Sequence, residues 1–304
     1  MEQIPFTSVQ QLREVFAAGD AVRDAGLVWP ENILVMRDLA YGPDPVWNLL
    51  DIVYPQEELG KLSPVIVSVH GGGWVYGDRK LYSHYCAELA KHGFAVVNFE
   101  YHLAPESPWP AALRDVIALF EWIRTMGYEH GIDAAQLFAV GDSAGAQLLA
   151  QYIAMAQNPK MQIPELPMPP EPLVPQAIAL NCGCYDMRPS LTAQPRGVEA
   201  EAYVPEVTGE ILEAMDTMKY LTEAFPPVFL MTSAQDFLRE QAQPMFRALQ
   251  RAGVPVVFKE YRSEDRELGH VFHLQLRLPE AQQCTREEIA FFKGFLHDTI
   301  DVDW

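Results

Sequence analysis

The sequence predicts an α/β fold built on a mostly parallel, twisted sheet of about eight strands that is flanked by helices. Two observations support this prediction. From residue 64 onward, short apolar runs typical of buried strands alternate with longer segments of helical periodicity. In addition, a serine lies between two glycines where one such strand gives way to a helix, at residues 141–145 (Gly-Asp-Ser-Ala-Gly). One large domain over residues 1–304 is expected from the length.

The first elements precede this alternation. Residues 8–25 predict an amphipathic helix. Its expected apolar face comprises Val9, Leu12, Val15, Phe16 and Val22. Residues 33–36 and 47–54 predict an antiparallel pair at the edge of the sheet, joined by a turn at residues 41–45 (Tyr-Gly-Pro-Asp-Pro).

The parallel part of the sheet follows. Its strands are expected at residues 64–69, 94–100, 137–141, 176–181, 227–232 and 255–261. Its helices are expected at residues 82–92, 110–126, 143–157, 238–252 and 284–298. Because the strands are apolar throughout, helices are expected on both faces of the sheet.

Two segments interrupt the alternation. Residues 158–175 contain seven prolines and predict an extended surface connection. Residues 183–224 include a helix-like run from 206 to 222. Its apolar stripe comprises Ile211, Leu212, Met215, Met218 and Leu221. The stripe either packs onto the main domain or forms a lid over a site, and one inserted helix can do both.

The composition narrows the classes of partner and compartment. With 41 acidic and 22 basic residues, the formal net charge is −19 at pH 7, which disfavours nucleic acid and anionic membrane surfaces. The four cysteines form no C-x-x-C pair and are expected as free thiols of a reducing compartment. No secretory signal is visible at the N-terminus, and no apolar stretch is long enough to cross a bilayer. A cytoplasmic protein without a membrane partner is therefore expected.

Ser143 is the candidate nucleophile. A serine at so tight a strand-to-helix turn takes a strained backbone conformation that pushes its hydroxyl out of the sheet. Gly141 and Gly145 remove side chains that would collide at the crossing of strand and helix. The helix N-terminus favours developing negative charge. The alternative is a glycine-rich turn with a solvated serine.

Residues 70–74 (His-Gly-Gly-Gly-Trp) directly follow a strand and predict an oxyanion loop. Gly72 and Gly73 are the expected donors, with the backbone N–H of Ala144 as the third. Removing one such donor typically costs about 2.7–4 kcal/mol of transition-state stabilisation. His70 is expected to hold the loop by hydrogen bonds.

Three neighbouring side chains are expected to bind substrate. They are Trp74, Tyr76 and Asp142. For one of the two aromatic residues, core packing is an equal alternative.

The base should follow the serine and the acid in the chain. After Ser143 three histidines remain, and His297 falls in the predicted C-terminal helix, where a structural role is expected. His270 is favoured over His273, because Gly269 precedes it in a loop after the last strand.

Asp236 is the expected acid, since it lies just beyond the strand at residues 227–232. Its task would be to orient the imidazole and stabilise the imidazolium. The alternative is a surface carboxylate, and Glu240 and Glu267 are weaker substitutes.

Together these motifs resemble the hormone-sensitive-lipase-like branch of the α/β-hydrolases, the bacterial family IV carboxylesterases and acetyl esterases. The matching pieces are residues 70–74 (His-Gly-Gly-Gly-Trp), 101–106 (Tyr-His-Leu-Ala-Pro-Glu), 141–145 (Gly-Asp-Ser-Ala-Gly), 236–240 (Asp-Phe-Leu-Arg-Glu) and 269–272 (Gly-His-Val-Phe). The resemblance implies Ser143 as nucleophile, Asp236 as acid and His270 as base. It also implies a helical cap, here residues 1–30 and 183–224.

The sequence departs from the family pattern at four positions. They are His102 in place of an arginine, Ala146 in place of a glycine, Phe237 in place of a proline and Glu240 in place of an aspartate. None of these changes removes an expected catalytic group, but they weaken any transfer of detailed substrate preference.

The expected function is hydrolysis of small-molecule esters with short acyl or acetyl groups, through an acyl-enzyme intermediate and without a metal or organic cofactor. Two alternatives remain. One is an amidase, formamidase or peptidase on the same scaffold, and the other is a non-catalytic ligand-binding relative. For the oligomeric state, a homodimer is considered as well as a monomer.

Overall fold

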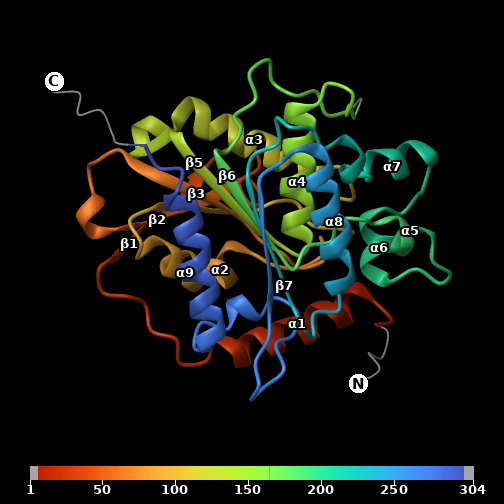
Figure 1. Cartoon of the computed structure of the whole chain (residues 1–304), viewed down its shortest axis with the longest axis horizontal. Coiled ribbons are helices and arrows are strands. Elements are labelled where there is room, and N and C mark those ends of the chain that lie inside the picture. Colours follow the sequence, from red (N-terminus) through yellow and green to blue (C-terminus); the bar gives the residue numbers. More distant parts are fainter. Residues whose placement is uncertain (1–5, 164, 298–304) are drawn as a thin grey trace.

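The centre of the molecule is an eight-stranded sheet in the order β1-β2-β4-β3-β5-β6-β7-β8 (Figure 1). The structure is a computed structural model that describes residues 6–163 and 165–297. The strands are β1 (Ile33–Ala40), β2 (Leu49–Pro55), β3 (Ser63–Val69), β4 (Ala95–Phe99), β5 (Ile132–Asp142), β6 (Ala177–Asn181), β7 (Val228–Ser233) and β8 (Val256–Tyr261). Strand β2 is antiparallel to β1 and β4, and the other neighbours are parallel. The predicted fold class and the antiparallel edge pair are confirmed.

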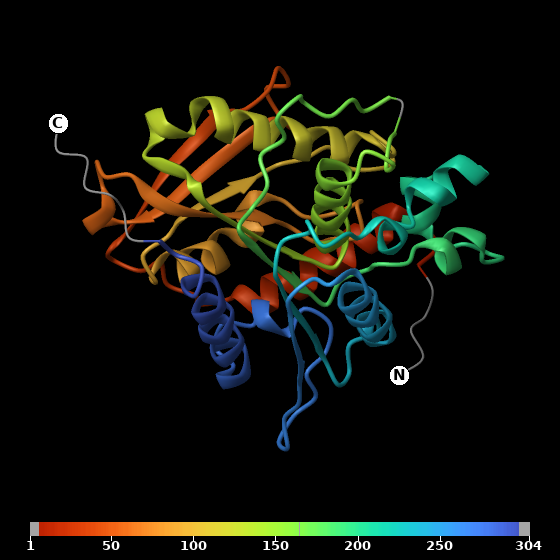
Figure 2. The same cartoon turned by 45° about the horizontal axis from the view of Figure 1, so that its top comes forward.

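Helices cover both faces of the sheet, as the apolar strands predicted (Figures 1 and 2). On one face lie α2 (Arg79–Ala90) and α9 (Pro279–Lys293). On the other lie α3 (Ala111–Met126), α4 (Ala144–Gln157) and α8 (Arg239–Ala252). Strands β4 and β6 are buried along their whole length, so each strand separates two apolar cores. Burial of one large apolar side chain contributes about 1.5–3 kcal/mol.

Two helices begin earlier than the sequence pattern predicted, for local reasons. Helix α2 begins at Arg79 because the Asp78 carboxylate caps it, accepting a hydrogen bond from the backbone N–H of Leu81 at 2.8 Å. Helix α9 begins at Pro279, a residue type favoured in the first helical turn. It ends at Lys293, so the expectation that His297 lies within the C-terminal helix is wrong; that histidine is exposed beyond the helix.

The predicted N-terminal helix is present as α1 (Val9–Asp24), but its buried face is narrower than expected. Leu12 is buried, and Val9 and Phe16 pack against the core. Val15 and Val22 are 51% and 77% exposed, so their place on the apolar face is a wrong prediction. The helix is also held by a polar anchor: Arg13 donates to the carbonyls of Val75 and Ala104 and forms an ion pair with Glu106.

The insertion between β6 and β7 folds as several short helices at one end of the molecule (Figure 2). They are α5 (Arg188–Thr192), α6 (Val198–Tyr203), α7 (Gly209–Ala214) and the 3₁₀ turn η3 (Thr217–Tyr220). The single helix expected over 206–222 is wrong, because Asp216 leaves the helical conformation (φ −87°, ψ 66°) and splits the run into α7 and η3. The apolar stripe packs on the main core, where Met215 is buried.

The proline-rich segment forms no helix or strand over its described residues, 158–163 and 165–175, as predicted. Its expected position entirely on the surface is wrong, however, because Met161, Ile163 and Leu166 are each 3% exposed. These three side chains anchor the connection to the core. The remaining 3₁₀ turns are η1 (Gln56–Glu58), η2 (Gly127–His130) and η4 (Phe272–Leu274).

Two further expectations are tested by the described residues. All four cysteines are free and buried, which confirms the prediction of unpaired thiols. Over residues 6–163 and 165–297, none of the helices has the length and apolar character that a bilayer crossing requires.

Candidate active site

Ser143 directly follows the carboxyl end of β5 and is the single residue between this strand and α4. Its backbone is strained, with φ 52° and ψ −116°, an arrangement that a non-glycine residue rarely adopts. The Ser143 N–H donates to the carbonyl of Asn181 at 3.0 Å, which ties the turn to the neighbouring strand β6. The side chain therefore stands at the end of the sheet, with the N-terminus of α4 directly behind it.

Gly145 permits the close crossing of α4 over the sheet. A Cβ atom at this position would lie 2.0 Å from the backbone oxygen of Val69 and 2.5 Å from that of His70. Both are main-chain atoms at the end of β3 and cannot rotate away. The glycine is thus required by the approach of helix to strand, as the sequence predicted.

The structure brings the three predicted triad side chains together. The distance from Ser143 Oγ to His270 Nε2 is 2.9 Å, and His270 Nδ1 lies 2.6 Å from Asp236 Oδ1. The serine hydroxyl can donate to Nε2 when the Nδ1 proton is donated to the carboxylate. The acid is fully buried, whereas the histidine side chain is 17% exposed. This is the geometry of an activated serine.

Asp236 is held by more than the histidine. Thr232 Oγ1 donates to Oδ2 at 2.8 Å, and the backbone N–H of Leu238 donates to Oδ1 at 2.9 Å. Burial alone would raise the pKa of this carboxyl, but the hydrogen bonds and the charge of His270 hold the pKa below its ordinary value. The carboxylate is therefore ionised and fixed in orientation at neutral pH.

The loops that carry the acid and the histidine are joined to each other. Gln235 and Gly269 form an isolated parallel bridge, and the backbone N–H of Leu268 donates to the Gln235 side chain at 3.0 Å. Ser233 Oγ lies 2.7 Å from the carbonyl of Leu268 and 2.9 Å from that of Gly269. The spacing of Asp236 and His270 thus depends on a rigid pair of loops beyond β7 and β8.

The predicted oxyanion loop lies beside the serine. Gly72 has φ 115°, and a Cβ there would lie 2.0 Å from the carbonyl oxygen of Tyr76, so only glycine fits. Among the described residues, no backbone acceptor pairs with the N–H groups of Gly72, Gly73 or Ala144. These three donors are free to meet an oxyanion.

Trp74 and Tyr76 connect this loop to the two segments expected to form a cap. The Trp74 indole is 6% exposed, donates to Gln147 at 3.0 Å and stacks on Tyr203 of α6, with ring centroids 4.7 Å apart. The Tyr76 hydroxyl donates to Asp20 of α1 at 2.8 Å. Both residues therefore have packing and hydrogen-bonding roles at the site, whereas the sequence left core packing open for one of the two.

Helix α6 also covers the oxyanion loop directly. The Cβ atom of Glu199 lies 3.6 Å from the point where a side chain on Gly73 would begin. The insertion thus limits the space above the serine on this side.

Asp142 lies beneath the oxyanion loop, and its side chain is not open to a ligand. It is 3% exposed, and its Oδ2 accepts a hydrogen bond from Tyr82 at 2.8 Å. The same hydroxyl accepts from the backbone N–H of Gly71 at 2.9 Å. Burial raises the pKa of the Asp142 carboxyl to about 7. Through Tyr82, Asp142 therefore supports the oxyanion loop.

Two other histidines lie near the site without reaching Ser143. His70 is buried, donates through Nδ1 to the Gly71 carbonyl at 2.7 Å and stacks on Tyr101. Burial lowers the pKa of His70 to about 4 and that of His273 to about 3, so both are neutral at physiological pH. His70 thus holds the loop as expected, and His273 is enclosed in the core, 1% exposed.

Cys182 is a site residue that sequence reasoning missed. Its Sγ, a carboxylate oxygen of Asp236 and a ring nitrogen of His270 all lie within 4.8 Å of one another. Such a trio could hold a metal ion. Asp236 and His270 already bond to each other, and burial raises the pKa of the Cys182 thiol well above its ordinary value, so the thiol is neutral.

Backbone strain gathers around these residues. Four of the five described non-glycine residues with positive φ adjoin the site: Trp74, Ser143, Cys182 and Val271. Strained residues persist where the surrounding structure holds them, commonly at functional sites. This signal exists only in the folded chain.

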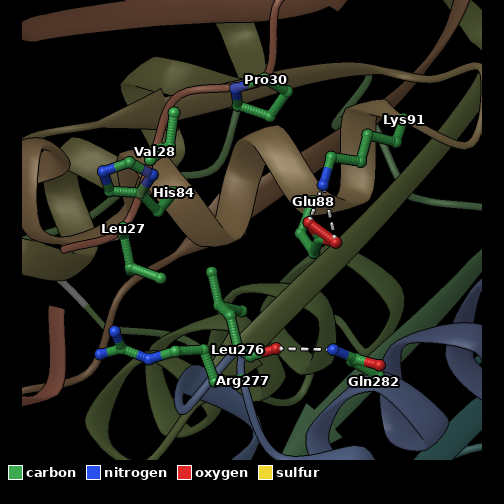
Figure 3. A pocket seen from close by; sticks show the side chains of 9 residues that line it. All are labelled: Leu27, Val28, Pro30, His84, Glu88, Lys91, Leu276, Arg277 and Gln282. Atoms are coloured by element: carbon green, nitrogen blue, oxygen red, sulfur yellow. Dashed lines mark hydrogen bonds and ion pairs between the residues drawn. The ribbon is translucent and has the colours of Figure 1, made fainter.

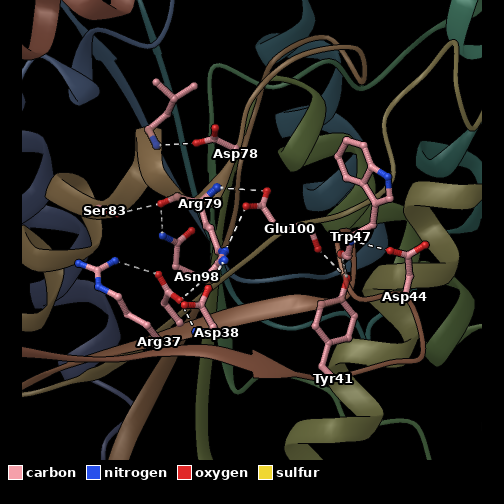
Figure 4. Close-up of polar contacts among 12 residues, drawn as sticks. Arg37, Asp38, Tyr41, Asp44, Trp47, Asp78, Arg79, Ser83, Asn98 and Glu100 are labelled. Atoms are coloured by element: carbon pink, nitrogen blue, oxygen red, sulfur yellow. Dashed lines mark hydrogen bonds and ion pairs between the residues drawn. The ribbon is translucent and has the colours of Figure 1, made fainter.

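An ion cluster lies at the start of α2, shortly after the oxyanion loop. From the first turn of α2, Arg79 reaches Asp38 at 2.5 Å and Glu100 at 3.1 Å (Figure 4). It also forms an ion pair with Asp51. The Arg79 side chain is only 8% exposed, so its charge must be paired. Arg79 lies five residues beyond Trp74, so the cluster fixes the start of α2 shortly after the oxyanion loop.

A separate surface cleft lies where the segment after α1, helix α2 and the segment before α9 meet (Figure 3). It is lined by Leu27, Val28, Pro30, His84, Glu88, Lys91, Leu276, Arg277 and Gln282. Its two strong cations are already engaged: Lys91 pairs with Glu88, and Arg277 donates to the carbonyls of Arg23 and Ala25. None of the triad side chains lines this cleft, so we place the candidate site at Ser143.

Comparison with known proteins agrees with this geometry. A family model described as alpha/beta hydrolase fold matches residues 66–274, a range that includes Ser143, Asp236 and His270. Versiconal hemiacetal acetate esterase of Dothistroma septosporum is 28% identical over 237 residues, which cover 72% of this chain and 69% of that protein. Carboxylesterase NlhH of Mycobacterium tuberculosis is 28% identical over 256 residues, covering 77% and 74%.

A solved structure shares the whole architecture. Esterase B from Lactobacillus rhamnosis superposes with a TM-score of 0.85 at 24% identity, covering 94% of each chain. At this identity the similarity concerns the fold, and it agrees with the predicted arrangement of sheet and helices.

Proposed function

The chain belongs to the α/β-hydrolase family and is a carboxylesterase-type hydrolase, and we propose that it cleaves small-molecule esters through Ser143, His270 and Asp236. The observation that carries the proposal is the unbroken line of contacts from Ser143 Oγ to His270 Nε2, at 2.9 Å, and from Nδ1 to Asp236, at 2.6 Å.

In the proposed first step, Ser143 Oγ attacks the ester carbonyl carbon while His270 Nε2 takes the hydroxyl proton. Asp236 keeps the Nδ1 proton on its side of the ring and stabilises the imidazolium. The carbonyl oxygen becomes an oxyanion, which the N–H groups of Gly72, Gly73 and Ala144 would meet. Collapse of the intermediate breaks the bond to the alcohol, which leaves with the proton from Nε2.

In the second step, water attacks the acyl group on Ser143 with His270 again as base. The acid product leaves, and the proton returns to the serine.

We assign short acyl groups, acetyl among them, to this site. Helix α6 lies over the oxyanion loop, with Glu199 Cβ 3.6 Å from the place of a side chain on Gly73. The cap contact between Trp74 and Tyr203 closes the same side. The Dothistroma relative is named for an acetate ester, which supports the same class.

A fluorophosphonate probe tests the nucleophile, because it reacts rapidly with an activated serine and hardly at all with ordinary serines. We expect one adduct, on Ser143, in the folded wild-type protein and none in Ser143→Ala. The variant should lose at least about 10⁴-fold in p-nitrophenyl acetate turnover and keep the wild-type melting temperature. Residual esterase activity within tenfold of wild type would refute the assignment, and a wild-type protein without an adduct would favour a ligand-binding relative.

A pair of matched substrates distinguishes the proposed esterase from an amidase or peptidase. An acetyl ester and the acetyl anilide of the same aromatic ring differ only in the atom that leaves. We expect kcat/KM to favour the ester by at least about 10²-fold, and a preference for the anilide would replace the proposed reaction.

We also propose a cytoplasmic location, which the four free buried thiols support, since disulfides are rare in that reducing compartment. Fractionation of cells that express the tagged chain would test it. For the oligomeric state, we propose a homodimer as the alternative to a monomer. Sedimentation velocity would distinguish the two.

A further inference from the structure

Phe237 is an exposed aromatic ring in direct contact with the candidate catalytic histidine. It is 61% exposed, and its ring centroid lies 4.2 Å from that of the His270 imidazole at an interplanar angle of 45°. It is also the single exposed phenylalanine among the described residues. The ring therefore combines broad solvent exposure with a direct contact to the imidazole.

The ring is not on a mobile tip, because the backbone on both sides of it is bonded. The N–H of Asp236 donates to the Ser233 carbonyl at 3.2 Å, and the N–H of Arg239 donates to the Asp236 carbonyl at 3.0 Å. The N–H of Leu238 donates to the Asp236 carboxylate at 2.9 Å. Phe237 is therefore presented beside His270 by the same turn that presents the acid.

The position of the ring defines which part of a substrate can reach it. During ester cleavage the leaving alcohol oxygen must lie within hydrogen-bond distance of His270 Nε2, about 3 Å, to receive its proton. The acyl group lies instead toward Ser143 and the N–H groups of Gly72 and Gly73. The substituent on the alcohol oxygen thus extends away from Ser143 and the oxyanion donors, alongside the imidazole that Phe237 contacts.

On the basis of the proposed esterase function, we propose that Phe237 forms the wall of an alcohol subsite and that the site prefers esters of aromatic or bulky apolar alcohols. The free face of the ring provides a stacking surface for an apolar leaving group. Aromatic pairs of this kind are worth about 0.5–1.5 kcal/mol, which corresponds to a preference of about 2- to 12-fold in kcat/KM.

The test uses benzyl acetate and ethyl acetate, which share the acyl group and a primary alcohol. For Phe237→Ala, we expect the benzyl-to-ethyl ratio of kcat/KM to fall about 2- to 12-fold, with a smaller fall for Phe237→Leu. The matched control is Tyr128→Ala, a 69% exposed aromatic residue in η2 before β5, away from the triad, which should leave the ratio unchanged. The acetate-to-butyrate ratio of the p-nitrophenyl esters should also stay constant, because it reports the acyl side.

Each outcome decides the proposal. An unchanged benzyl-to-ethyl ratio in Phe237→Ala overturns it, and so does an equal loss for both acetates, which would mean that the ring only shields His270. Fluorophosphonate labelling of Ser143 in each variant verifies that the triad is intact. A wild-type protein that hydrolyses neither acetate and takes no label overturns the esterase function itself, a result distinct from failure of the subsite alone.

Discussion

Asp142→Asn would test the electrostatic cost of the residue beside the serine. The Asp142 carboxyl is 3% exposed, and burial raises its pKa from 3.8 to about 7 against the hydrogen bond from Tyr82, which lowers it. An acid with a higher pKa in the native state binds its proton more tightly when folded. The wild-type protein therefore loses stability as the pH rises from about 4 to about 7, and this loss is complete above that range.

The magnitude follows from the two pKa values. The difference between 3.8 and about 7 corresponds to about 4 kcal/mol once the carboxyl is ionised in both states. At pH 5 the carboxyl is ionised in the unfolded state but still protonated in the native state. The free energy of unfolding is then about 1.7 kcal/mol lower than at acidic pH, where both states are protonated. Asparagine has the same size and no charge. The stability of Asp142→Asn relative to wild type should thus increase by about 2.5 kcal/mol between pH 5 and pH 8.

Urea unfolding at pH 5, 6, 7 and 8, followed by tryptophan fluorescence, measures this difference. Asp265→Asn serves as the matched control for loss of a carboxylate, because Asp265 is exposed in the loop after β8. A difference between wild type and Asp142→Asn that is constant with pH would refute the assignment of a raised pKa at this position.

Three further substitutions test the geometry of the site. Gly145→Ala should cost about 3 kcal/mol or more in urea unfolding, because the new Cβ would lie 2.0 Å from the Val69 carbonyl oxygen; a variant of wild-type stability would contradict this crossing. Thr232→Val removes the donor to Asp236 Oδ2 and should lower esterase kcat/KM about 5- to 10-fold, whereas unchanged kinetics would show that the other contacts suffice. Tyr203→Ala removes the ring stacked on Trp74 and should cost about 3–5 kcal/mol in thermal unfolding; a cost below about 1 kcal/mol would mean that α6 is not held by this pair.

Much of the fold was predictable because its signals are local. The apolar strands β3 to β7 are buried on both faces, so each reads as a short continuous apolar run within the chain. The serine turn and the oxyanion loop were likewise visible, since close backbone approach at Gly145 and Gly72 admits no side chain.

The predictions failed where contacts with other parts of the chain determine the structure of a segment. The predicted apolar face of α1 included too many residues, because of the five only Leu12, Val9 and Phe16 contact the core. The run at 206–222 has helical periodicity but breaks at Asp216, and its two halves pack separately on the main core. Periodicity shows which residues can share a face and leaves open how much of that face another element covers.

By itself the sequence determined the fold class and the chemical identity of the candidate triad, because glycine positions, strand runs and the order of serine, acid and histidine are properties of the chain. Only the tertiary structure decided the distances, since Ser143 and His270 are 127 residues apart in sequence and 2.9 Å apart in space. It also decided that Asp142 is enclosed while Phe237 is exposed beside His270. Burial and contact arise from the packing of loops from different strands, which no local pattern encodes.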